Sequence, residues 1–115
     1  HRVKLKSMID SENLSGKKVI GYGASARSST MLNFCGIDHN HLACVADQNA
    51  LKHNRYTPGT DVLIVSPEEA LKENPDTVVI LAWNFKDEII EDLKEKGFKG
   101  SVIIPLPNTP YLLEI

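Results

Sequence analysis

The sequence predicts an α/β fold, namely an open, mostly parallel five-stranded sheet with helices on both faces. Short apolar segments alternate with segments of helical character along the chain, which is the pattern of a parallel sheet with right-handed crossovers. A glycine turn, Gly21-Tyr22-Gly23, follows the first apolar segment. Residues 78–82 are apolar at every position, as expected for a central strand buried on both faces.

The first half of the chain contains the elements that surround the glycine turn. Residues 2–13 favour a short helix with an imperfect apolar face, which Ser15-Gly16 ends. Residues 19–22 form the first predicted strand, and residues 26–34 form a helix that stops before Gly36. Residues 42–46 form the second strand.

The second half begins with a polar, turn-rich segment, residues 48–60, in which no clear helix is visible. Residues 62–65 form the third strand. Ser66, Pro67 and Glu69 then match a helix N-terminus with a capping box, because serine caps, proline fits the first turn and glutamate stands three residues after the cap.

The last elements complete the predicted sheet. Residues 78–82 form the fourth strand, and the following helix has Asn84 as its expected N-cap. Its buried stripe consists of Phe85, Ile89, Ile90 and Leu93. Residues 102–104 form the fifth strand, and the prolines at 105, 107 and 110 make the tail non-helical. A strand order of 3-2-1-4-5 would make this a Rossmann-like half.

Composition excludes several classes of protein. The 115 residues are 42% apolar and 24% charged, with a net charge of -2 and no basic stripe, so no nucleic-acid partner is expected. No apolar run approaches the roughly 20 residues that span a bilayer, so no membrane association is expected. No signal peptide is visible, and Cys35 and Cys44 fit reduced, buried thiols, so a cytoplasmic location is expected.

The glycine turn matches the pattern G-x-G-x-x-A through Gly21, Gly23 and Ala26. The first glycine would permit a tight turn, and the second would let backbone approach a ligand closely. Free N–H groups from Ala24 to Ser28 would then favour an anionic group at the start of the helix. The alternative is that these small residues serve packing alone.

Other candidate site residues each carry a structural alternative. Asp47, after the second strand, fits either a ribose-binding carboxylate or a turn cap. Trp83-Asn84 follows a central strand, where ligands of open sheets bind, but could serve packing and capping. Arg55-Tyr56 is expected at the same sheet edge, or belongs to a plain turn. His39 and His41 lack a third metal ligand nearby, so no metal site is predicted.

Three blocks of the sequence carry a resemblance to a known family. They are GYGASARSSTMLNFCGI at 21–37, VADQNALKHNRYTPGTDVLI at 45–64 and PDTVVILAWNFKDEII at 75–90. Together they resemble the C-terminal domain of S-adenosylmethionine-dependent sugar C-methyltransferases. Arg27 stands where lysine is common in that family, and it still offers charge and forked donors to a phosphate.

The resemblance implies a three-part parent enzyme with a zinc-binding N-terminal region and a central domain that holds S-adenosylmethionine. The substrate would be a nucleotide-linked deoxy-keto-sugar, whose enolate attacks the methyl group of the donor. Residues 1–16 would be a linker helix from an upstream domain, and residues 17–115 the Rossmann-like C-terminal domain. This chain would bind the nucleotide-sugar, face the central domain, and hold neither zinc nor the donor. It would contribute no catalytic residue and would be inactive alone.

A methyl-donor site usually has an acidic residue just before its glycine turn, but here the residues in that place are Val19-Ile20. Their apolar side chains agree with a methyl donor that is held elsewhere. Two other classes of function stay open, a self-standing module that binds NAD or coenzyme A, and a structural module that binds nothing and orders the central domain. The candidate substrate- and phosphate-binding residues are Gly21, Tyr22, Gly23, Ala24, Ser25, Arg27, Ser28, Asp47, Arg55, Tyr56, Trp83 and Asn84.

Overall fold

The computed structural model describes residues 2–115, which form one six-stranded sheet in the order β3-β2-β1-β4-β5-β6. Every neighbouring pair is parallel except β5 and β6. The predicted α/β class and the order 3-2-1-4-5 are therefore confirmed. The strands are β1 (Val19–Tyr22), β2 (Val45–Ala46), β3 (Ile64–Val65), β4 (Thr77–Ile80), β5 (Ser101–Ile104) and β6 (Tyr111–Glu114).

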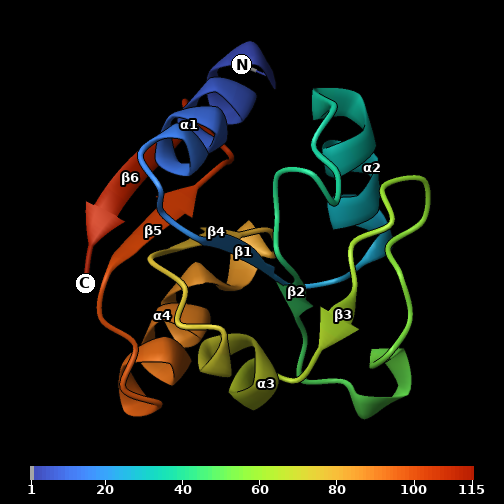
Figure 1. The fold of residues 1–115 in the computed structure, drawn as a ribbon, viewed down its shortest axis with the longest axis vertical. Helices are drawn as coiled ribbons and strands as arrows, with labels where there is room; N and C mark the ends of the chain where they lie inside the picture. Colours follow the sequence, from blue (N-terminus) through green and yellow to red (C-terminus); the bar gives the residue numbers. More distant parts are fainter. Residues whose placement is uncertain (1) are drawn as a thin grey trace.

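Helices cover both faces of the sheet. Figure 1 shows α1 and α2 above the sheet and α3 and α4 below it. The strand side chains alternate between the two layers, since Val79 packs with the α1 and α2 side chains and Ile80 packs with those of α4. The helices are α1 (Arg2–Leu14), α2 (Ala26–Cys35), α3 (Pro67–Lys72) and α4 (Lys86–Glu95), with short 3₁₀ helices η1 (Ala50–Lys52) and η2 (Trp83–Phe85).

The sixth strand is a correction to the five-stranded prediction. The segment from Pro105 to Pro110 is non-helical, as expected, but the chain then reverses and β6 pairs antiparallel with β5, with Ile104 opposite Tyr111. The prolines fall in the connection, where they cost no sheet hydrogen bond. Both faces of β6 are exposed, so no alternation of apolar and polar residues marks it in the sequence.

The strands of the β2–β3 edge are shorter than predicted. The second strand covers only Val45–Ala46 of the expected residues 42–46. The third covers only Ile64–Val65 of the expected residues 62–65. Single backbone hydrogen bonds, from Ala43 N–H to Val19 O and from Val45 N–H to Leu63 O, continue the pairing beyond them without a full ladder. As expected, no α-helix connects β2 to β3, and the loop contains only η1.

The start of α4 differs from the prediction that Asn84 caps it. Asn84 lies inside η2, α4 begins at Lys86, and the residue at the cap position, Phe85, provides no side-chain hydrogen bond. Phe85 is also 54% exposed rather than part of the buried stripe, which Ile89 and Leu93 form. The preceding strand, β4, ends at Ile80 rather than at residue 82, so the chain leaves the sheet two residues earlier than expected.

The expected N-terminus of α3 is confirmed for Ser66 and Pro67, but the capping box is only half formed, because Glu69 Oε1 pairs with Lys72. Ser66 Oγ accepts a hydrogen bond from Glu69 N–H at 3.1 Å, and Pro67 occupies the first helical turn. This arrangement satisfies one backbone donor that the helix itself leaves unpaired.

The helix α1 shares the hydrophobic core with the rest of the chain. Leu5 and Ile9 are fully buried, and the Glu12 carboxylate accepts a hydrogen bond from Thr77 Oγ1 of β4. A role for α1 as a linker from an upstream domain stays a prediction.

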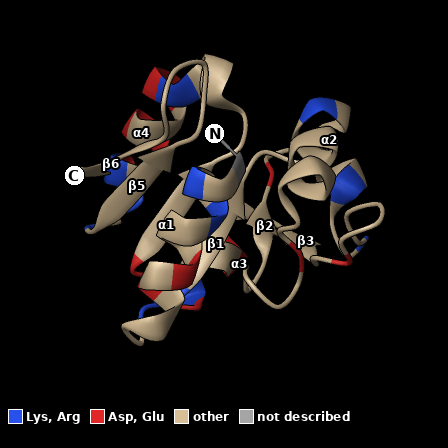
Figure 2. Cartoon of the chain, turned by 90° about the horizontal axis from the view of Figure 1, so that it is seen from above, with Lys and Arg blue, Asp and Glu red and all other residues tan. Residues whose placement is uncertain are grey.

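The surface and the thiols agree with the compositional analysis. Cys35 and Cys44 are buried, and neither forms a disulfide. Figure 2 shows basic and acidic residues mixed along α4, whereas on α1 the basic residues lie in the first half of the helix and the acidic residues in the second. Among residues 2–115 no helix combines the length and apolarity needed to cross a bilayer.

Candidate functional site

The glycine turn lies at the carboxyl edge of the sheet, directly after β1. Gly23 has a φ of +106°, and a Cβ placed there would come within 2.6 Å of Ala82 Cβ and 2.9 Å of Ala82 N. Both the backbone conformation and the packing therefore require glycine at this position. Gly21 has a different role from the expected tight turn, because it lies inside β1 and leaves room for the side chain of Leu81.

The N-terminus of α2 is capped by its own serines. Ser25 Oγ accepts the N–H of Ser28, Ser28 Oγ accepts the N–H of Ser25, and Ser28 Oγ lies 2.8 Å from Gly23 O. The N–H of Ala24 is also taken, by the carboxylate of Asp47. The expected row of free N–H groups from Ala24 to Ser28 is therefore wrong in part, because side chains of this chain bind three of them.

Asp47 acts as a structural clamp at the end of β2. Its Oδ2 accepts the N–H of Ala24 and its Oδ1 accepts the N–H of Asn49, each at 2.8 Å. Lys52 donates to Ala24 O, and its Nζ lies 3.6 Å from Asp47 Oδ2. Of the two alternatives for Asp47, this geometry matches the turn cap, since both carboxylate oxygens already have backbone partners.

Two hollows flank the turn, one on each side of the sheet. The first, here called the α4-side cleft, has a volume of about 350 Å³. Tyr22, Gly23, Ala24, Ser25, Asp47, Gln48, Ala82, Phe85, Glu88 and Ile89 line it. The second, the α2-side cleft, has a volume of about 320 Å³ between α2 and the loop from β2 to β3. Its floor is apolar, from Leu32, Val45, Ile64 and Leu81, and Lys52 lies at its wall.

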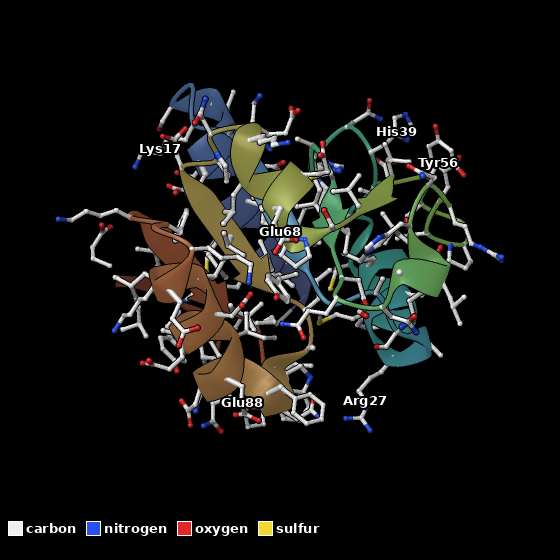
Figure 3. All side chains as sticks on the ribbon, turned by 90° about the horizontal axis from the view of Figure 1, so that it is seen from below. Lys17, Arg27, His39, Tyr56, Glu68 and Glu88 are labelled. Atoms are coloured by element: carbon white, nitrogen blue, oxygen red, sulfur yellow. The ribbon has the colours of Figure 1, made fainter. Side chains whose placement is uncertain are left out.

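Three other predicted site residues lie close to the turn. Figure 3 shows Arg27 extending from the start of α2 at the same edge of the molecule as Glu88. Arg27 is exposed and forms no hydrogen bond or ion pair with residues 2–115, so its charge is available to a ligand. Trp83 is half-buried and Asn84 is exposed, both in η2 just beyond β4.

The pair Arg55-Tyr56 is not brought to this edge, which corrects the expectation. The segment pairs antiparallel beside β3, with Tyr56 opposite Leu63 and Arg55 O accepting the N–H of Ile64. Because the segment runs back along β3, Tyr56 lies beside His39 at the opposite end of the molecule from Arg27 in Figure 3. Neither residue lines one of the two clefts.

A polar network around the buried hydroxyl of Tyr22 borders the α4-side cleft, and its outer members, Gln48 and Lys96, are exposed. Sequence reasoning found only one of its members. The hydroxyl of Tyr22 donates to Asp92 Oδ2 at 2.6 Å, and Gln48 Nε2 donates to the Tyr22 hydroxyl oxygen at 3.1 Å. Asp92 in turn pairs with Lys96. Asp92 belongs to a helix face that reads as solvated, and Gln48 belongs to no motif, so no signal in one sequence marks either residue.

Protonation states in this network follow from burial and contacts. Burial, and then the hydrogen bond to Asp92, raise the pKa of Tyr22 above its usual range, so the phenol keeps its proton at neutral pH. Burial also opposes ionisation of Asp92, but hydrogen bonds from Lys96 and Tyr22 outweigh it and hold the pKa of Asp92 below its usual value. The network thus consists of a cation, a carboxylate, a neutral phenol and an amide.

The histidines do not form a metal site within the described residues. His41 Nδ1 lies 3.1 Å from Asp38 Oδ1, and His39 is exposed. No group of three histidine, cysteine, aspartate or glutamate side chains within residues 2–115 is arranged to hold a metal ion.

Comparisons with known proteins agree with the three sequence blocks. The family model described as the C-methyltransferase C-terminal domain matches residues 1–107. The chain is 36% identical over 108 residues to the C-methyltransferase NovU of Streptomyces niveus, in an alignment that covers 93% of this chain and 26% of that protein. The chain thus spans about a quarter of the length of this relative.

A solved structure supports the fold. The UDP-D-quinovosamine 4-dehydrogenase from Vibrio fischeri superposes with a TM-score of 0.55 at 22% identity, over 86% of this chain and 94% of that chain. At this identity the likeness concerns the fold alone. The family model extends over nearly the whole chain, and the chain belongs to the C-methyltransferase C-terminal domain family.

Proposed function

We propose that this chain is the substrate-side domain of an S-adenosylmethionine-dependent C-methyltransferase that acts on a nucleotide-linked deoxy-keto-sugar. The observation that carries the proposal is the α4-side cleft, which adjoins the glycine turn of a domain from a C-methyltransferase family. Ligands of open α/β sheets bind at this carboxyl edge of the strands. The charge of Arg27, which has no partner within residues 2–115, would attract the diphosphate of such a ligand.

The residues of this chain do not fit the methyl donor or a zinc ion. Asp47, which could otherwise bind the hydroxyls of the donor, already has backbone partners on both carboxylate oxygens. No three potential zinc ligands gather within residues 2–115. We therefore assign S-adenosylmethionine and zinc to other parts of the parent protein.

The proposed contribution of this chain is binding and orientation. The Arg27 side chain and the N–H groups of Ala26 and Arg27, which the serine caps leave open, would hold the diphosphate. Trp83 and Asn84 would border the sugar nucleotide at the end of β4. Removal of the proton beside the keto group and attack on the methyl group would take place against the central domain. The purified 115-residue chain is accordingly expected to transfer no methyl group.

A titration of the chain with thymidine diphosphate, NAD and coenzyme A tests this proposal. We expect thymidine diphosphate to bind and to shift the backbone amide signals of Gly23 and Arg27 in nuclear magnetic resonance spectra. Charge reversal by Arg27→Glu should weaken that binding, whereas Lys4→Glu, on the exposed face of α1, should not. Tight binding of NAD without thymidine diphosphate would instead support a self-standing nucleotide module.

Two further results would contradict the assignment. Methyl transfer by the purified chain would show that the catalytic groups lie within it. If the isolated chain bound no thymidine diphosphate, the structural alternative, in which this domain only orders its neighbour, would be favoured. If the affinity were the same in the Arg27→Glu variant, the proposed role of Arg27 would be contradicted.

A further inference from the structure

The hydroxyl group of Tyr22 is buried in the wall of the α4-side cleft, and the proposed function makes no use of it. The residue is 3% exposed, and its hydroxyl meets Asp92 from α4 and Gln48 from the loop after β2. Three segments that are distant in the sequence are therefore joined at one oxygen atom, beside a cleft of about 350 Å³.

The chemistry of these groups fixes the direction of each hydrogen bond. An ionised carboxylate only accepts hydrogen bonds, so the Tyr22 hydroxyl must donate a hydrogen bond to Asp92. The phenolic oxygen is then left as an acceptor, and its partner on Gln48 must be the Nε2 amide group. Lys96 pairs with Asp92 and favours its charged form, which keeps this polarity in place.

Because this arrangement of hydrogen bonds uses the Nε2 amide group of Gln48, the Oε1 oxygen of Gln48 remains available as an acceptor. Gln48 Oε1 has no hydrogen-bond partner within residues 2–115, and Gln48 lines the α4-side cleft. The neighbouring acceptor, the Asp47 carboxylate, is used by the backbone N–H groups of Ala24 and Asn49. Of the adjacent side chains Asp47 and Gln48, which follow β2, only Gln48 thus has a side-chain oxygen without a hydrogen-bond partner within residues 2–115.

We propose that Gln48 Oε1 accepts a hydrogen bond from a ribose hydroxyl of the nucleotide ligand, and that Tyr22 and Asp92 are positioning residues that orient this amide. The inference rests on the proposed function, because it names the group of the same cleft that would bind the ribose. A neutral amide suits this place, since its oxygen accepts a hydrogen bond from a hydroxyl group without adding negative charge near a diphosphate. Asp47 and Glu88 already supply two carboxylates to the cleft lining.

Two matched pairs of nucleotides measure the contribution of the hydroxyls directly. They are uridine diphosphate with its 2′,3′-dideoxy analogue and thymidine diphosphate with its 3′-deoxy analogue, titrated by calorimetry against the 115-residue chain. We expect the wild-type chain to prefer the hydroxyl-bearing member of the bound pair by about tenfold, which is the usual contribution of one hydrogen bond. In Gln48→Met, which keeps a side chain of similar length, the ratio should fall to nearly one.

Tyr22→Phe tests the positioning role while it leaves the aromatic ring in the core. In this variant the preference for the hydroxyl-bearing nucleotide of the bound pair should fall as it does in Gln48→Met. The side-chain amide signals of Gln48 should also shift in ¹H–¹⁵N spectra. Tyr111→Phe removes a hydroxyl from the exposed strand β6 and should keep the wild-type ratio. A merely structural effect of Tyr22→Phe would weaken both nucleotides equally and leave the ratio unchanged.

The outcomes separate this inference from the proposed function. If wild-type protein binds either nucleotide but the ratio persists in Gln48→Met, the inference is overturned and the proposed function stands. Unchanged Gln48 amide signals in Tyr22→Phe would overturn the positioning role of Tyr22. If wild-type protein binds neither pair, the proposed function fails and the inference fails with it.

Discussion

The carboxylate of Asp47 accepts the backbone N–H of Ala24 at 2.8 Å, which ties the loop after β2 to the turn after β1. Lys52 adds a second tie, because its ammonium group donates to the carbonyl oxygen of the same alanine. The turn is therefore held on both its N–H and its C=O side by residues of one loop. A turn held in this way keeps its shape in the free protein, which lowers the cost of ordering it around a ligand.

Replacement of Asp47 by alanine should destabilise the chain. The N–H groups of Ala24 and Asn49 would lose their acceptor, and the charge of Lys52 would lose its partner. We expect the free energy of unfolding to fall by about 1–3 kcal/mol in urea denaturation. Asp87→Ala, whose side chain is 84% exposed, should change it by less than about 1 kcal/mol. Equal effects of the two variants would contradict the clamp.

Gly23→Ala should be far more costly than the matched substitution Gly16→Ala. Both glycines have positive φ values, +106° and +79°, so both substitutions strain the backbone by about 1–2 kcal/mol. Only at Gly23 does the new Cβ meet other atoms, those of Ala82. We expect Gly23→Ala to lower the free energy of unfolding by at least about 2 kcal/mol more than Gly16→Ala. Similar midpoints in thermal unfolding would argue against the close approach of Gly23 and Ala82.

Ile9→Ala tests whether α1 is part of the folded unit. Ile9 is fully buried in the core cluster that also contains Leu32 of α2. Loss of its side chain should lower the free energy of unfolding by about 2–5 kcal/mol. Val3, on the same helix, is 73% exposed, so Val3→Ala should cost under about 0.5 kcal/mol. If both variants unfold like the wild type, α1 behaves as a separate linker and not as part of the core.

Alkaline pH should weaken the fold through Cys44. Burial raises the pKa of the Cys44 thiol to about 11, from an ordinary value of 9.0. The unfolded chain therefore releases this proton at lower pH than the folded chain does. The stability contributed by the neutral thiol is complete below about pH 9 and is lost as the pH rises toward 11, at no more than about 1.4 kcal/mol per pH unit.

Urea denaturation between pH 8 and pH 11 checks this expectation, with Cys44→Ala as the comparison. The variant should be less stable than the wild type at pH 8, because it leaves a small cavity. The difference between the two proteins should then narrow as the pH rises. Curves that stay parallel over this range would show that Cys44 does not titrate as its burial implies.

Local signals in the sequence predicted the layers and the central strands well. The apolar run at 78–82 and the glycine at 23 each reflect a requirement of the fold, burial on both faces in one case and close packing against Ala82 in the other. Two of the three blocks that led to the family, residues 21–37 and 75–90, contain these constrained positions. Such positions tolerate few residue types, and that is why one sequence is enough to identify them.

Features that depend on contacts between residues far apart in the sequence could not be predicted. The sequence allows two roles for Asp47, and only its hydrogen bond to Ala24, 23 residues away, selects the structural one. Tyr56 was placed at the wrong edge because the antiparallel pairing of its segment with β3 has no signature in the loop composition. The roles of Asp92 and Gln48 depend on the buried oxygen of Tyr22, which lies 70 and 26 residues away.

The reversal of the chain into β6 has a practical consequence for the experiments above. Because β6 runs antiparallel to β5, Ile115 lies beside Gly100, just before the start of β5. Ile115 and Gly100 exchange two backbone hydrogen bonds. The glycine turn lies beyond the other ends of the strands. A tether attached after Ile115 would therefore leave the cleft facing away from its support, so the protein can be immobilised on a biosensor chip with its ligand entrance open to the flowing solution.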